Sequence, residues 1–161
     1  LVEASQAFVV GDRRIILLDT PGFDNTAMML SDGDISEAVV EYMKAGRGDR
    51  KLYGIIYLQN VDERRPREAE TLLKPFEELC DNVSPRRVAL VTTMWESDHL
   101  RVGEAREKEL KEREEFWAPA LKRGAKLHRH DGTKESAENI LLSLFSTQDT
   151  AQPTQDYRLI A

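Results

Sequence analysis

Four aliphatic residues, Ile15 to Leu18, run without a break into Asp19-Thr20-Pro21-Gly22. This stretch predicts a buried strand that ends in a tight turn, because Pro fixes φ and Gly tolerates a close approach to its backbone. In α/β proteins with parallel sheets, ligands bind at the carboxyl ends of the strands. The pattern therefore places Asp19 at the ligand edge of such a sheet. A simple strand-ending turn is the alternative for this tetrapeptide.

The rest of the chain alternates between apolar runs typical of strands and segments with helical spacing. Gly11-Asp12 separates the first two strands and suits a tight hairpin turn. Asp34 to Glu37 has the form of a capping box, and Thr133 also suits a helix cap. A hairpin followed by alternating helices and strands predicts a mostly parallel sheet with one antiparallel edge hairpin and helices on both faces. Strands are expected at 5–10, 15–20, 52–58, 87–93 and 125–129, and helices at about 35–45, 69–80, 98–123 and 134–145.

The length of 161 residues fits one domain, which we expect to occupy residues 1–146. Residues 147–161 begin with a polar run without periodicity and are expected to form a disordered tail. The charge-dense run from Glu104 to Glu115 mixes both signs at helical spacing and is read as a solvated helix face, with Phe116 and Trp117 as anchors.

Composition narrows the function classes. The net charge is −6 and the basic residues are interleaved with acids, which argues against a nucleic-acid partner. No apolar run approaches the ~20 residues of a membrane span, so no transmembrane segment is expected. The single cysteine, Cys80, fits a reducing compartment, and the predicted location is cytoplasmic.

Several phrases of the sequence resemble one family. Asp19-Thr20-Pro21-Gly22-Phe23-Asp24 resembles the third GTPase motif of septin-like and immunity-associated (paraseptin-type) GTPases. Gly54 to Leu58, Val91 to Trp95 and Thr133 to Ala137 are similar to fungal G-domain proteins of that branch. The likeness spans roughly residues 6–145 in one order. It implies a phosphate-loop NTPase-like three-layer sandwich with GTP or GDP and Mg²⁺ as ligands.

The resemblance assigns roles around the first motif. Asp19 is expected to hold Mg²⁺, and Thr20 and Gly22 are expected to contact the nucleotide, with Gly22 sensing the terminal phosphate. Phe23 stands where small GTPases keep a water-orienting Gln, so Asp24 and Asn25 are the candidate catalytic residues. Phe23 to Leu30 would form the second switch.

A second group of residues is expected to contact the base. Thr93, Met94, Trp95 and Glu96 stand where most GTPases carry Asn-Lys-x-Asp. Glu96 supplies a carboxylate for the guanine edge, and Met94 is expected to lie along the base as a Lys stem does. Trp95 is expected either to stack on the base or to be buried against the sheet. Asp131-Gly132-Thr133 is the candidate for the last base-contacting segment.

The sequence also departs from the family pattern. It contains no G-x-x-x-x-G-K-[ST] phosphate loop, since no Gly is followed by Lys. The resemblance implies that this loop and its strand precede Leu1, so we expect a sheet incomplete at the amino end and lacking a central strand. The expected function is a GTP-binding switch with slow GTP hydrolysis, with a homodimer or a protein effector as partner. The alternative is a nucleotide-free, degenerate G domain that acts as a protein-interaction module.

Overall fold

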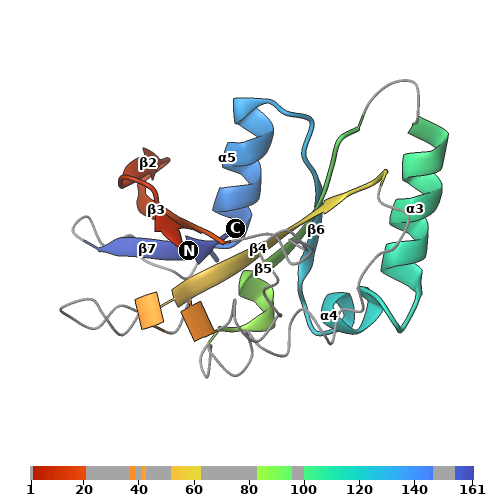
Figure 1. The fold of residues 1–161 in the computed structure, drawn as a ribbon, viewed down its shortest axis with the longest axis horizontal. Helices are drawn as coiled ribbons and strands as arrows, with labels where there is room; N and C mark the ends of the chain where they lie inside the picture. The colour runs from red at the N-terminus through yellow and green to blue at the C-terminus, as the bar shows by residue number, and fades with distance from the viewer. Residues whose placement is uncertain are drawn as a thin grey trace.

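In a computed structural model of the chain, the described residues are 2–20, 37–38, 41–42, 52–62, 83–95, 100–146 and 155–161. They contain one seven-stranded sheet, the α-helices α3, α4 and α5, one short 3₁₀ helix, η1, and the helical residues 37–38 and 41–42 (Figure 1). The strands are β1 (Glu3–Ala4), β2 (Phe8–Val10), β3 (Arg13–Asp19), β4 (Leu52–Asn60), β5 (Val88–Thr93), β6 (Lys126–Arg129) and β7 (Asp156–Ile160). The helices are η1 (Pro85–Arg87), α3 (Leu100–Glu112), α4 (Ala118–Lys122) and α5 (Lys134–Ser143).

The sheet is mixed and mostly parallel, in the order β1-β3-β7-β4-β5-β6, with β2 also paired to β3. Strands β3, β7, β4, β5 and β6 are parallel, and β1 and β2 run antiparallel to β3. The turn between β2 and β3 contains Gly11 at φ +60°, a backbone conformation that Gly adopts without strain. The predicted α/β class, the mostly parallel sheet and the antiparallel edge hairpin are therefore confirmed.

Helices cover both faces of the sheet. Ile140, Leu141 and Leu144 at the α5 side pack on one face, while Leu110 of α3 and Ala120 of α4 belong to the cluster on the other. Burial on both faces explains why β4 and β5 read as continuous apolar runs in the sequence. No helix among the described residues is long and apolar enough to cross a membrane.

The last segment of the chain lies at the centre of the sheet. Strand β7 lies between β3 and β4 and is parallel to both. The expectation of a disordered tail is wrong for residues 155–161, and residues 147–154 lie outside the described residues. The physical reason is burial, because Tyr157, Leu159 and Ile160 are only 4%, 0% and 2% exposed.

The region expected to be helical at 98–123 is divided into α3 and α4. Trp117, 1% exposed, separates them, and its backbone N–H donates to the Leu110 carbonyl at 2.9 Å. Trp117 is thus the anchor that the sequence predicted, and it turns the chain back onto the sheet. Residues 37–38 and 41–42 are helical, as expected after the capping box. The helix expected at 69–80 lies outside the described residues.

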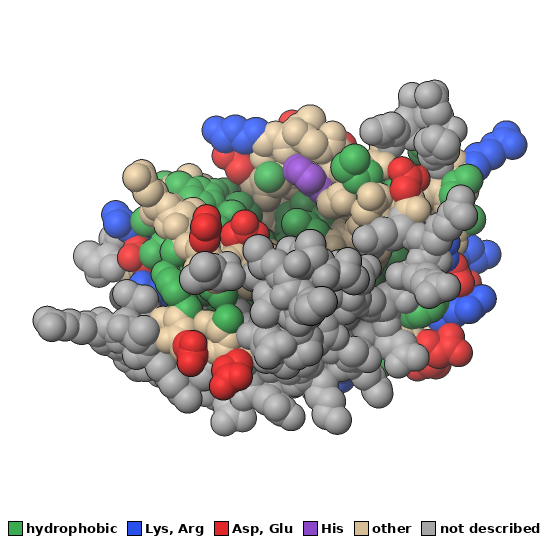
Figure 2. Space-filling view, in the orientation of Figure 1, with side chains coloured by type: hydrophobic (Ala, Val, Ile, Leu, Met, Phe, Trp, Pro, Cys, Tyr) green, Lys and Arg blue, Asp and Glu red, His purple; other side chains and the backbone are tan. Residues whose placement is uncertain are grey.

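Hydrophobic side chains also reach the surface near β2 and α5 (Figure 2). Val9 of β2 is 66% exposed and Leu142 of α5 is 37% exposed. Strand β2 pairs with the first half of β3, so this apolar surface lies at the amino end of β3, away from Asp19.

Candidate functional site

The predicted site residues that the structure describes follow the ends of several parallel strands. Asp19 ends β3 and Thr20 follows it, Thr93 ends β5, and Asp131 to Thr133 follow β6. Because these strands are parallel, their carboxyl ends meet at one edge of the sheet. The structure therefore brings the two predicted groups to the same edge. Gly22, Asp24, Asn25 and Glu96, together with the second switch at 23–30, lie outside the described residues.

Asp19 lies at the end of β3 with its side chain exposed. Thr20 contacts Ala161, the residue that follows β7. Both the backbone N–H and the hydroxyl of Thr20 donate to the Ala161 carbonyl oxygen, each at 3.4 Å. In return, the Ala161 N–H donates to the Leu18 carbonyl at 3.1 Å. The end of β7 thus fixes the backbone on which Asp19 and Thr20 are carried, and it leaves the Asp19 carboxylate in solvent.

Met94 has an unusual backbone at the end of β5. Its φ is +62°, the only positive φ of a non-glycine residue in the described part of the chain. L-residues with long side chains rarely adopt this conformation. The Met94 side chain is 51% exposed, whereas the Thr93 hydroxyl before it donates to the Gln59 carbonyl at 3.4 Å. Of the two, Met94 is therefore the side chain presented to the outside of the sheet edge.

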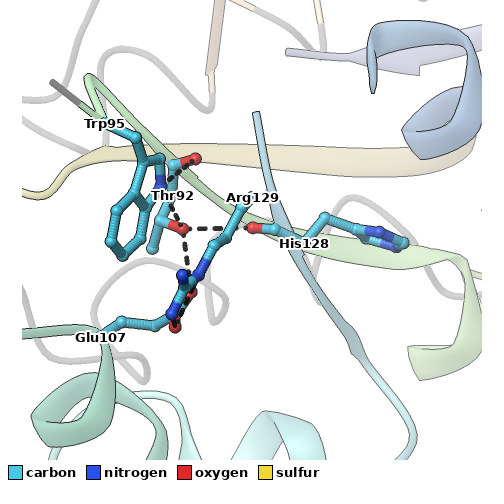
Figure 3. Close-up of polar contacts among 5 residues, drawn as sticks. All are labelled: Thr92, Trp95, Glu107, His128 and Arg129. Atoms are coloured by element: carbon cyan, nitrogen blue, oxygen red, sulfur yellow. Dashed lines mark hydrogen bonds and ion pairs between the residues drawn. The ribbon is translucent and has the colours of Figure 1, made fainter. Parts of the chain in front are cut away.

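Trp95 folds back against the sheet (Figure 3). Its indole Nε1–H donates to the Thr92 carbonyl oxygen at 3.2 Å and lies 3.1 Å from the Thr92 Oγ1. The Arg129 guanidinium stacks on the indole, with Cζ 4.0 Å from the ring centroid. Of the two placements expected for Trp95, the structure has the one against the sheet, and one indole face is covered by Arg129.

The Arg129 guanidinium is held by a buried carboxylate on α3. Its Nε lies 3.0 Å from both oxygens of Glu107, and one Nη lies 2.5 Å from Oε2. These hydrogen bonds raise the pKa of Arg129. Glu107 is only 7% exposed and also accepts a hydrogen bond from the Thr92 hydroxyl at 3.1 Å. Buried carboxylates need such partners, because an unpaired buried charge is strongly destabilising.

Sequence reasoning missed Glu107 and Arg129. Glu107 belongs to the run from Glu104 to Glu115 that was expected to be a solvated face, and for Glu107 this expectation is wrong. Glu107 faces inward, but its charged neighbours at helical spacing gave the whole run the pattern of a solvated helix face. A signal was present, because Gly103, Glu107 and Leu110 follow one another at i, i+4 and i+7 on the buried face of α3.

The loop after β6 is ordered by its own side chains. The Asp131 carboxylate accepts hydrogen bonds from the Thr133 N–H at 2.9 Å and from the Thr133 hydroxyl at 2.6 Å. These two bonds lower the pKa of Asp131. The Thr133 hydroxyl in turn accepts from the Ser136 N–H at 3.1 Å and caps α5, as the sequence predicted.

A hollow of about 450 Å³ lies where this loop and α5 meet the end of β6. His128 lines it, and the close-up shows the imidazole pointing away from the Glu107–Arg129 pair. Within the described residues, the His128 Nε2 is the one buried side-chain N or O atom without a hydrogen-bond partner. Burial, and then the charge of Lys126, lower the pKa of His128, so the ring is neutral near pH 7. The hollow is lined by His128, Arg129, Asp131, Thr133, Glu135, Ser136, Asn139 and Ile140.

The described residues contain no group of three or more His, Cys, Asp or Glu side chains that is arranged to hold a metal ion. A magnesium ion bound with a nucleotide has a smaller requirement, since one or two carboxylates, waters and the phosphate oxygens complete its shell. Asp19, exposed at the sheet edge, fits this second arrangement. It does not fit a metal site made by the protein alone.

Comparisons of the chain with models of protein families, with curated proteins and with solved structures gave no match.

Proposed function

We propose that this chain is part of a GTP-binding switch protein of the septin-like type, with slow GTP hydrolysis. The observation that carries the proposal is the shared sheet edge: the Asp-Thr pair at the end of β3 and the Thr-Met-Trp segment at the end of β5 belong to parallel strands of one sheet. Ligand sites of open α/β sheets lie at such an edge.

Under this proposal, Asp19 and Thr20 lie on the phosphate side of the nucleotide, and Met94 lies on the side of the base. Asp19 would hold Mg²⁺, mostly through water, and Thr20 would lie on the phosphate side. Met94 offers an exposed apolar side chain for the flat face of the base. The candidate carboxylates for the base edge are Glu96, which follows Trp95 in the sequence, and Asp131, which follows β6. Bound GTP supplies the phosphoanhydride bond that is hydrolysed.

The rate expected for hydrolysis follows from the first motif. Phe23 has no group that orients water, and Asp24 and Asn25 are the nearest polar candidates in the sequence. A switch that hydrolyses GTP slowly remains in its GTP state until a partner or a second copy supplies the missing group.

Nucleotide titration tests the proposal. GTP and GDP are titrated against the protein made from its complete reading frame and against residues 1–161 in parallel, each with Mg²⁺ and with EDTA. We expect Mg²⁺-dependent binding that favours guanine over adenine nucleotides, and weaker binding by residues 1–161 because they contain no phosphate-loop sequence. Asp19→Asn should remove the Mg²⁺ dependence. An absence of binding by both proteins at millimolar nucleotide would overturn the proposal.

The second candidate is a nucleotide-free interaction module. It is favoured by large apolar side chains that remain exposed at the ends of β4 and β5 and in the first turn of α3. Exposed apolar surface of this kind is typical of protein-binding sites. Under this alternative, alanine substitutions at these positions weaken a protein partner's binding without any effect of nucleotide. The residues concerned are Leu58, Met94 and Leu100.

A further inference from the structure

Met94 is held in a strained backbone conformation from both sides. Before it, Thr93 is fixed in the sheet, where its carbonyl accepts from the Val61 N–H at 3.2 Å and its hydroxyl contacts Gln59. After it, Trp95 is fixed by the indole hydrogen bonds to Thr92. A positive φ at a residue with a long side chain persists only where its surroundings impose it.

Trp95 is itself held between two elements. Arg129 of β6 stacks on the indole at 4.0 Å, and Gly103 of α3 approaches its six-membered ring. A Cβ placed on Gly103 would lie 3.0 Å from Cζ3 of Trp95 and 3.3 Å from a methyl carbon of Val61. A side chain at this helix position therefore requires the indole or Val61 to give by a few tenths of an ångström.

Glu107 completes the arrangement, because it orients Arg129 through both carboxylate oxygens and also bonds Thr92. Figure 3 shows the four side chains in contact, with Arg129 between the carboxylate of Glu107 and the indole of Trp95. A salt bridge is not required to fold a helix onto a sheet, and apolar residues of similar volume often serve as well. The carboxylate of this pair is buried and the Arg129 side chain is 47% exposed. The hydrogen bonds to both Glu107 oxygens fix the direction of the guanidinium plane, and this plane lies against Trp95.

We propose that Glu107 and Arg129 are positioning residues: they clamp Trp95 and thereby hold Met94 in a preformed shape that presents its side chain to a flat, purine-like ring. This inference rests on the proposed function for the identity of the ligand, but the clamp itself is a property of the free protein. The strain at Met94 is then retained because the exposed side chain is used, since a glycine would adopt the same backbone more easily.

The first experiment measures the strain in residues 1–161 without any ligand. Met94→Gly and Met94→Ala both remove the side chain beyond Cβ, and they differ by the Cβ methyl group, which restricts the backbone of alanine. At an ordinary φ the alanine variant is the more stable of such a pair. At φ +62° we expect the reverse order, with the glycine variant melting at the higher temperature. A higher melting temperature for the alanine variant would show that Met94 is not strained and would overturn the proposal.

The second experiment disturbs the packing around Trp95 without a substitution at Glu107 or Arg129. Gly103→Ala is compared with Val102→Ala, a neighbouring substitution on α3 at a side chain that is 59% exposed. Alanine favours the helix over glycine, so α3 itself is not weakened. We expect Gly103→Ala to shift the Trp95 indole N–H and Met94 methyl NMR signals, and Val102→Ala to leave them in place. Unchanged signals in Gly103→Ala would contradict the clamp.

The third experiment links the clamp to the ligand. The affinities for GDP and ADP are measured for wild type, Gly103→Ala, Glu107→Gln and Val102→Ala. Because the contacts around Trp95 set the position of Met94 against the base, we expect a several-fold loss of the GDP-to-ADP affinity ratio in Gly103→Ala and Glu107→Gln and none in Val102→Ala. Equal ratios in all four proteins would overturn the positioning role. If wild type binds neither nucleotide, the proposed function fails, and the clamp is still decided by the melting and NMR experiments.

Discussion

Arg14 of β3 and Asp156 of β7 are 142 residues apart in the chain, and the Arg14 Nε lies 2.6 Å from the Asp156 Oδ1. The pair marks the start of a register in which Arg14 pairs with Asp156 and Leu18 with Ile160. Strands β3 and β4 are not neighbours in the sheet order, and β7 is the strand between them. The C-terminal segment therefore joins the half of the sheet that carries Asp19 to the half that carries Met94.

Removal of this strand should abolish the cooperative fold. A protein that ends at residue 154 loses the only strand between β3 and β4 in the described sheet and exposes two unpaired strand edges. We expect loss of a cooperative thermal transition by circular dichroism and self-association by light scattering. A monomeric, cooperatively melting truncated protein would show that the two halves hold together without β7.

Point substitutions in β7 separate the core contribution from the surface contribution. Leu159 is fully buried, and Leu159→Ala should lower the free energy of unfolding by about 2–5 kcal/mol. Asp156→Asn removes an ion pair whose arginine is 54% exposed, and it should cost about 1 kcal/mol or less. Urea unfolding of both variants measures the difference. Similar losses in the two variants would contradict a strand anchored by its core side.

The cap of α5 gives a local prediction. The Thr133 hydroxyl accepts from the Ser136 N–H and donates to Asp131, so Thr133→Ala removes both contacts. We expect a loss of about 0.5–2 kcal/mol in the free energy of unfolding, as for other N-cap residues. Thr133→Ser keeps the hydroxyl and serves as the matched control, which should stay close to wild type.

Most of the architecture was predictable because it depends on local pattern. The apolar run of β4, the hairpin glycine and the Thr133 cap each act over a few residues, and each is where the sequence places it. Strand β7 was not predictable in this way. Its three apolar residues, Tyr157, Leu159 and Ile160, follow a long polar run, and their burial depends on pairing with β3 and β4, which are distant in the sequence.

The candidate site was predictable in its sequence motifs and not in its supporting contacts. Asp19 could be placed at a strand end because it directly follows an apolar run, and Met94 because it follows the predicted strand at 87–93. The positive φ of Met94 and the stacking of Trp95 on Arg129 depend on contacts between β5, β6 and α3. The periodicity of a single segment carries no information about contacts between elements that are distant in the sequence. In the sequence of α3, Glu107 therefore resembled its solvated neighbours.

The unpartnered histidine predicts a pH dependence of stability. Burial and Lys126 lower the pKa of His128 in the folded protein below the ordinary value of 6.5. As the pH falls below 6.5, the unfolded chain takes up a proton that the folded chain resists, so stability falls with falling pH until the folded pKa is reached. We expect urea midpoints that decrease from pH 7.5 to pH 5.5 in wild type.

Two variants test whether His128 causes this pH dependence of stability. His128→Gln should reduce the decrease, because the titrating group is gone. Lys126→Met should reduce it by a smaller amount, because burial, the larger cause, remains. If the slope of the midpoint against pH is the same in wild type and in His128→Gln, the effect comes from other groups.

The last prediction concerns the rate of GTP hydrolysis by the protein made from its complete reading frame. Phe23 stands where a water-orienting Gln would be needed, so intrinsic turnover should be at or below the ~10⁻⁴ to 10⁻³ s⁻¹ of unassisted small GTPases. The missing group then comes from Asp24 or Asn25 in the same chain, or from a partner molecule. A group supplied by a second copy makes the turnover per molecule rise with protein concentration, whereas a group in the same chain leaves it constant. Turnover measured over a wide dilution series, with Asp24→Ala and Asn25→Ala as controls, decides between them. Fast turnover that is independent of concentration and lost in Asp24→Ala would refute the slow switch and make Asp24 the water-positioning residue.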